Sequence, residues 1–234
     1  MHFLNACYQA LTQLFYPHQC AGCGSDTISS DRILCATCTT ALPETGFAEI
    51  PGNPVERIFY GRIPLIAAHS QYYFSAGSLI QRLVHQLKYQ NGIDQGLLLG
   101  KLTAYSLQES GRFSNLDGII PLPMYPDKQQ LRGYNQARVI ADGMAEVLNI
   151  PVVDQVLIRQ RYTETQTKKH RTSRWENVRN SFAITDPSAI QNQHWLLVDD
   201  VVTTGATLEA AGAVLLEQQQ VQLSVATLMY AVKQ

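Results

Sequence analysis

The stretch from His194 to Leu208 constrains the fold of this chain more than any other part of the sequence. Four apolar residues run into the acidic pair Asp199–Asp200, and a loop rich in threonine and glycine follows. The apolar run does not alternate with polar residues, which is typical of a strand buried on both faces of a parallel sheet. Apolar residues then recur at helical spacing from about Ala206 to Gln219. The acidic positions of this helix are left for solvent: Glu209 and Glu217. The order strand, loop, helix predicts an α/β fold.

The loop after this strand has the chemistry of a phosphate site. In open α/β sheets, ligands bind outside the carboxyl ends of the strands. A helix N-terminus there offers free N–H groups and a positive dipole to an anion, and threonine hydroxyls add donors. The residues that we expect to hold the phosphate are Val202, Thr203, Thr204, Gly205, Ala206 and Thr207. A tight strand-to-helix turn with capping threonines is the alternative interpretation.

The acidic pair points to a sugar next to that phosphate. Carboxylates repel phosphate, so Asp199 and Asp200 are interpreted as acceptors for sugar hydroxyls, or as outer ligands of a substrate-bound Mg²⁺. A phosphate with a diol beside it is a ribose 5-phosphate. The loop lacks the lysine of a P-loop, which argues against an ordinary P-loop NTPase. The whole block resembles the phosphoribosyl pyrophosphate (PRPP) motif of the type I phosphoribosyltransferases.

Four of the five cysteines form two C-x-x-C pairs near the start of the chain. They are Cys20, Cys23, Cys35 and Cys38. This pattern predicts a closed, structural Cys₄ zinc site. Four free thiols or a redox pair are the alternatives. His18 is assigned to the surface beside the site, because the four cysteines already complete a tetrahedral set.

Composition and the N-terminal residues limit the classes of protein to which this chain can belong. The chain has 234 residues, of which 45% are hydrophobic and 16% charged, and its net charge of −1 gives no overall case for nucleic-acid binding. No apolar run approaches the length of a membrane span, and Met1–Asn5 lacks the basic start of a secretory signal. We therefore expect a cytoplasmic protein with reduced thiols.

The elements along the chain predict two domains. Residues 3–15 have an amphipathic helical pattern that carries Cys7, and the stretch from Leu42 to Pro54 is expected to be a linker. We place a zinc-binding module at 1–44 and an α/β domain at 45–234. The remaining predictions are strands at 65–74, 117–123, 152–158 and 221–231, helices at 77–89, 93–109 and after 137, and a basic lid at 159–179. His85 and Lys88 are assigned to the solvated face of their helix.

Further motifs narrow the resemblance. Asp117–Pro123 reads D-x-I-x-P-x-P, Arg132–Gln136 reads R-G-Y-N-Q, and R-x-T-x-x-Q and R-x-x-N-V follow at Arg161 and Arg174. With the Cys₄ segment, an L-K-Y stretch and the PRPP motif, this order is similar to that of the ComF family (ComFC/GntX-like proteins). The chain departs from the family at Lys169, where an apolar residue is expected.

The resemblance implies a type I phosphoribosyltransferase fold: a mostly parallel sheet, helices on both faces, and a hood. It implies transfer of a phosphoribosyl group from PRPP to an acceptor, with pyrophosphate released and Mg²⁺ bound with PRPP. The implied catalytic residues are Asp199, Asp200, Arg132 and Arg174. The implied pyrophosphate loop is Pro121, Leu122, Pro123 and Met124. Further lid cations that could clamp the leaving group are Arg161, Lys168 and Arg171.

Three functions of different classes remain open at this point. The favoured one is a PRPP-dependent transferase in nucleotide metabolism. The second is a PRPP-binding regulator without turnover, because the ComF family is associated with competence and DNA uptake. The third is a single-stranded DNA binder that uses the zinc module and the basic lid. The sequence does not specify the acceptor, the partners among competence proteins, or whether the chain forms a homo-oligomer.

Overall fold

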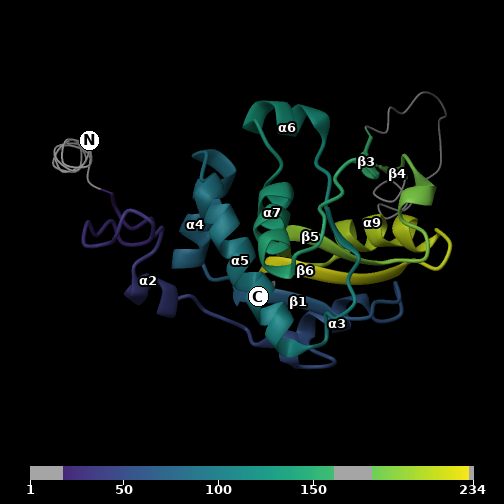
Figure 1. The fold of residues 1–234 in the computed structure, drawn as a ribbon, viewed down its shortest axis with the longest axis horizontal. Coiled ribbons are helices and arrows are strands. Elements are labelled where there is room, and N and C mark those ends of the chain that lie inside the picture. The colour runs from purple at the N-terminus through teal and green to yellow at the C-terminus, as the bar shows by residue number, and fades with distance from the viewer. Residues whose placement is uncertain (1–17, 161–180, 232–234) are drawn as a thin grey trace, which may run out of the picture.

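A computed structural model describes residues 18–160 and 181–231 of the chain. Its centre is a four-stranded, fully parallel sheet in the order β1-β6-β5-β2 (Figure 1). The strands are β1 (Ala68–Tyr73), β2 (Gly118–Pro121), β5 (His194–Val202) and β6 (Gln222–Tyr230). The non-alternating apolar run therefore forms a central strand of the sheet, as predicted.

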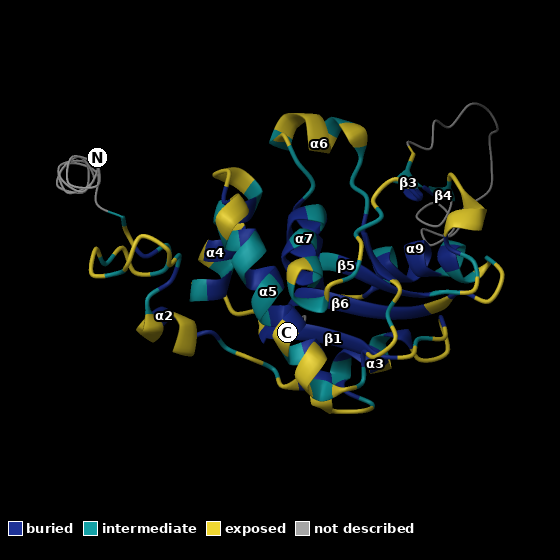
Figure 2. Ribbon diagram, viewed as in Figure 1, coloured by how far each residue is buried: buried dark blue, intermediate teal, exposed yellow. Residues whose placement is uncertain are grey.

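Both faces of β5 are covered by helices, which explains why its sequence does not alternate. Leu196 and Val198 pack in a core with α4 (Leu79–Tyr89), α5 (Ile93–Ser110) and α7 (Gln136–Leu148). Trp195 and Leu197 pack in a second core on the opposite side. The helices that cover this side are α3 (Pro54–Phe59) and α9 (Ala206–Leu216). In Figure 2 the strands of the sheet are mostly coloured as buried. The predicted α/β fold with helices on both faces is confirmed.

Helices α5 and α7 touch through their backbones. A Cβ atom at Gly100 would overlap the carbonyl oxygen of Ile140, and one at Gly143 would overlap that of Leu97. Only glycine allows so close an approach at these two positions. The two helices therefore pack as one unit against the sheet.

The strand predicted at 152–158 is wrong in extent. Val152 makes a single parallel bridge to Ile119, next to β2. The later part of the segment forms β3 (Leu157–Arg159), which pairs antiparallel with β4 (Phe182–Ile184) in a separate two-stranded sheet. The single apolar pattern thus serves two sheets, which periodicity alone does not reveal.

The predicted linker is also corrected, because the segment from 42 to 54 packs against the main sheet. Leu42 is buried, and η1 (Phe47–Glu49) buries Phe47. The side-chain amide of Asn53, itself buried, donates to the carbonyls of Phe47, Ile50 and Ala68. Polar groups of the segment are thus satisfied inside the fold.

The elements left to place are α2 (Ala36–Thr40) in the cysteine segment, α6 (Pro126–Arg132) after β2, and η2 (Pro187–Ala189) before β5. The predicted N-terminal helix with Cys7 and nearly all of the predicted lid lie outside the described residues. Among the helices in the described ranges, none is long and apolar enough to cross a bilayer.

Candidate functional site

The acidic pair lies near the carboxyl end of β5 and is not free of partners. Asp200 is buried, and its Oδ2 lies 2.5 Å from Nζ of Lys88 on α4. The assignment of Lys88 to a solvated face is therefore wrong: its side chain is only 23% exposed. The helical pattern marks Lys88 as polar, but it does not show that α4 brings this residue to β5.

Asp199 keeps some exposed surface, and its surroundings disfavour a second negative charge. Burial raises the pKa of Asp199 well above its usual range, and the neighbouring charge of Asp200 adds to this effect. Lys88 and Arg159 act in the opposite direction. The pair is thus a crowded, partly neutralised acidic site, which a cation or hydroxyl donors on a ligand would stabilise further.

The threonine loop enters α9 through a left-handed residue. Gly205 has φ +72°, and a Cβ there would lie 2.5 Å from Cγ2 of Ile58. No side chain caps the first turn of α9. Thr203 and Thr204 are exposed, whereas Val202 is buried and Ala206 and Thr207 are half-buried. The loop therefore offers hydroxyls and uncapped backbone N–H groups to an anion.

Arg62 fixes this loop, and sequence reasoning missed it. Its Nη1 donates to the carbonyl of Thr204 at 3.1 Å and to Oε2 of Glu209 at 3.3 Å. Glu209 is buried, so its expected exposure to solvent is wrong. Arg62 belongs to no motif and lies far away in the sequence, so no local signal could have shown it.

The predicted pyrophosphate loop lies beside the acidic pair. Pro121 pairs with Val198 in the sheet, and the N–H of Leu122 donates to the carbonyl of Val198 at 2.8 Å. The amide of Asn135, which caps α7, donates to the carbonyl of Leu122 at 3.0 Å. Pro123 and Met124 follow, half-buried, before α6. The carboxyl ends of β2 and β5 thus bring the two motifs to the same edge of the sheet.

The predicted basic residues separate into a described and an undescribed group. The guanidinium of Arg132, at the end of α6, lies 5.4 Å from the ring centroid of Tyr89. Arg132 lines a pocket of about 700 Å³ between α4 and α6 together with Lys88 and Lys128. The other predicted cations lie outside the described residues: Arg161, Lys168, Arg171 and Arg174.

Arg159 is a second residue that sequence reasoning missed. Its guanidinium carbon lies 4.1 Å from the ring centroid of Tyr125 and 5.1 Å from that of Phe182. Tyr125 directly follows the predicted pyrophosphate loop. The buried Nε of Arg159 has no hydrogen-bond partner among the described residues. The sequence shows this arginine only as the first of a basic stretch, because its two aromatic neighbours come from other segments.

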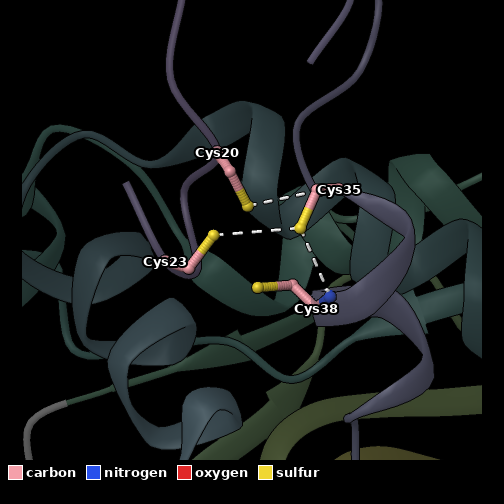
Figure 3. A group of neighbouring side chains, drawn as sticks. All are labelled: Cys20, Cys23, Cys35 and Cys38. Carbon is pink, nitrogen blue, oxygen red and sulfur yellow. Dashed lines mark hydrogen bonds between the residues drawn. The ribbon is translucent and has the colours of Figure 1, made fainter. Parts of the chain in front are cut away.

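The four predicted zinc ligands converge (Figure 3). All four sulfur atoms lie within 4.8 Å of one another, and Sγ of Cys23 and Sγ of Cys35 are 3.8 Å apart. A tetrahedral zinc ion with Zn–S bonds of about 2.3 Å places its sulfurs about 3.8 Å apart, so the cluster has suitable dimensions. The described cysteines are free thiols, not disulfides.

The backbone around these sulfurs also suits thiolates. Sγ of Cys20 accepts from the N–H groups of Gly22 and Cys35, and Sγ of Cys35 accepts from that of Cys38. Burial opposes ionisation of Cys20, but these N–H donors lower its pKa to about 6. Burial raises the pKa of Cys38 to about 12, so the charge of an ion is needed to ionise the complete set. The donor set fits a structural zinc ion.

One family model and several solved structures are similar to this chain. The family model "Phosphoribosyl transferase domain" matches residues 135–233, which include the threonine loop, α9 and β6. Among solved structures, the chain is similar to an adenine phosphoribosyltransferase, with a TM-score of 0.39 and 18% identity over 64% of this chain and 74% of that one. The same enzyme from Saccharomyces cerevisiae gives a TM-score of 0.35 and 17% identity, over 83% and 86%. The domain match and the parallel sheet together define a protein with a phosphoribosyltransferase fold.

Curated relatives narrow this class. "Competence protein F" of Haemophilus influenzae is 32% identical over 54% of this chain and 57% of its own length. "DNA utilization protein YhgH" of Salmonella typhi is 31% identical over 57% and 60%. "Competence protein ComFC" of Bacillus subtilis is 29% identical over 43% and 38%. The chain thus spans little more than half the length of the first two relatives. Together with the domain match, they support the resemblance to the ComF family.

Proposed function

We propose that this chain binds PRPP at the β5–α9 loop and transfers its phosphoribosyl group to an acceptor, with release of pyrophosphate. Two relatives are named for competence and for DNA utilization, and we place the proposed reaction of this chain in the same setting. The proposal extends to the whole site: Asp199 and Asp200 at the ribose, the loop 202–207 at the 5′-phosphate, and the loop 121–124 with Arg132 at the diphosphate. Arg174 is proposed as a further clamp from outside the described residues.

One observation carries this proposal. The acidic pair, the uncapped start of α9 and the loop after β2 lie at the same edge of one parallel sheet, because β2 and β5 are hydrogen-bonded neighbours. A ligand that spans them needs a phosphate at one end, a diol in the middle and further negative charge beyond. PRPP has these three features in this order.

The reaction is a substitution at C1 of the ribose. The bond from C1 to the diphosphate oxygen breaks, and the diphosphate leaves with the electron pair. A lone pair of the acceptor forms the new bond to C1, and the acceptor's proton passes to solvent or to a base. The transition state carries positive charge at C1, so the carboxylates of Asp199 and Asp200 stabilise it electrostatically, while Arg132 stabilises the leaving diphosphate.

Mg²⁺ fits this site as a companion of the substrate. Asp199 and Asp200 are adjacent carboxylates, and Lys88 forms an ion pair with only one of them. Oxygen ligands of this kind suit Mg²⁺, which binds proteins through one or two carboxylates and substrate phosphates. Bound in this way, the ion would supply charge neutralisation of the diphosphate.

Calorimetric titration of the full chain with PRPP, with and without Mg²⁺, tests the proposal. We expect magnesium-dependent binding with a Kd in the range of about 1 μM to 1 mM, typical of enzyme substrates. Ribose 5-phosphate is the control ligand, which should bind more weakly because it lacks the diphosphate. Binding would justify a screen of acceptors by pyrophosphate release. Absence of PRPP binding would overturn the proposal.

A non-catalytic role is the second candidate, as a PRPP-binding regulator or a single-stranded DNA-binding factor. The pocket that Lys88, Lys128 and Arg132 line favours the DNA-binding form, because Tyr89 beside it is 67% exposed and could stack on a base. This function predicts DNA binding that weakens steeply as salt rises, whereas PRPP turnover with an acceptor would favour the transferase.

A further inference from the structure

The contact between Lys88 and Asp200 joins two segments that are far apart in the sequence. Asp200 has a side chain that is only 9% exposed, and the ammonium of Lys88 is its ion-pair partner at 2.5 Å. A carboxylate in such surroundings is costly unless a cation compensates it. Lys88 thus makes it possible for a second carboxylate to lie directly beside Asp199.

Helix α4 is held on two sides, so Lys88 is not free to drift from this position. The side chains of Arg82 and Gln86 donate to the carbonyls of Gly22 and Ala21 in the cysteine segment, at 3.3 and 3.2 Å. Next to Lys88 itself, the hydroxyl of Tyr134 donates to the carbonyl of Leu87. The backbone of the last turn of α4 is therefore fixed relative to both the cysteine segment and the R-G-Y-N-Q motif.

The side chain of Lys88 also faces the pocket between α4 and α6. This pocket contains two more cations, Lys128 and Arg132, and none of the described residues that line it is acidic. An ammonium group has three N–H donors, and the contact with Asp200 needs only one of them. Lys88 can therefore hold Asp200 and face an anion in the pocket at the same time.

We propose that Lys88 is a positioning residue for Asp200: it fixes and neutralises this carboxylate, so that the acidic pair can accept a ribose while an anionic diphosphate lies next to it. This inference rests on the proposed function, since PRPP is the ligand that needs both properties. Lys88 would act through Asp200 and through charge compensation.

The experiment compares PRPP affinity in the presence of Mg²⁺ for the full chain and for K88M, K88R, D200N and the double variant K88M/D200N. We expect K88M to bind roughly 10- to 100-fold more weakly, since truncation of one partner leaves a buried charge uncompensated. K88R, which keeps the charge, should recover most of that loss. In the D200N background, K88M should cost about threefold or less, because the two residues act as one unit.

K101M is the matched control. Lys101 lies on the neighbouring helix α5 and pairs with Glu146 at the same nitrogen–oxygen distance, 2.5 Å, but it does not contact the acidic pair. Its loss should leave PRPP affinity unchanged. Thermal unfolding of each variant separates lost binding from lost folding.

Three outcomes decide the matter. Weak binding by K88M, rescue by K88R and a non-additive double variant support the inference. Wild-type affinity in K88M, or full additivity with D200N, overturns the role of Lys88 and leaves PRPP binding intact. Failure of the wild-type protein itself to bind PRPP overturns the proposed function, and this inference with it.

Discussion

The cysteine cluster and the site at the end of β5 differ in how they are assembled. The cluster takes all four sulfurs from residues 20–38, and two of its sulfurs accept hydrogen bonds from N–H groups within the same segment. The site at β5 needs partners from far away: Lys88 on α4, Arg62 after α3, and Arg159 on β3. A metal centre can thus be nearly complete within one short segment, whereas a site for a large, charged substrate depends on the whole sheet.

Removal of both carboxylates of the acidic pair should have the largest effect on ligand binding at the end of β5. In D199N/D200N, we expect PRPP and Mg²⁺ binding to fall by at least about 100-fold, since charge at the ribose and at the ion is lost together. The fold should survive, because asparagine keeps the shape of the side chain. Calorimetry and thermal unfolding measure the two effects. D142N is the control: Asp142 pairs with Arg138 on α7 and is 38% exposed. Unchanged PRPP affinity in the double variant would exclude this site.

Loss of one sulfur should disable the cysteine cluster and leave the residues of the site at the end of β5 in place. C35S removes a ligand whose sulfur also accepts the N–H of Cys38, so we expect zinc loss and a less stable N-terminal segment. Elemental analysis and thermal unfolding measure this. The control is T39A in α2, the short helix that begins directly after Cys35. Wild-type protein without zinc would refute the metal assignment. A separate unfolding step for residues 1–44 would support the proposed division of the chain at 44/45.

Substitution of Gly205 tests whether the loop needs its backbone shape. In G205A, the alanine must adopt φ +72° and its methyl group overlaps the side chain of Ile58. We therefore expect a loss of about 1–3 kcal/mol in unfolding free energy and weaker PRPP binding. G111A is the control, because Gly111 also has a positive φ, of +65°, but no atom lies within 4 Å of the added Cβ. It should cost only about 1 kcal/mol and leave binding unchanged. Equal effects of the two substitutions would argue against a special role for the loop.

Arg62 should have the smallest effect, because its side chain is 44% exposed. We expect R62M to weaken PRPP binding by no more than about fivefold, in line with exposed ion pairs. R57M is the matched control, since Arg57 likewise donates to a backbone carbonyl, that of Gly52, but away from the threonine loop. A loss equal to that of D199N/D200N would mean that Arg62 contacts the ligand directly.

These differences also explain what could be predicted from sequence. The parallel sheet and the helices around it follow from strong local patterns, such as the apolar run of β5 and the periodicity of α4, and both are confirmed. The convergence of the cysteines is confirmed because spacing within one segment determines it. The partial burial of Lys88 and the burial of Glu209 were not predictable, because they depend on which helix packs beside which strand. Periodicity identifies a polar position but does not identify its partner.

Gly100 and Gly143 carry no charge and belong to no motif, yet they determine where α7 lies, and Asn135 at the start of α7 anchors the loop after β2. A screen for inactive variants should therefore recover substitutions at these two glycines alongside those in the acidic pair. Because neither residue has a side chain, these two glycines determine the distance between helices α5 and α7. A larger residue at either position would displace α7 and, through Asn135, the loop proposed to hold the leaving group.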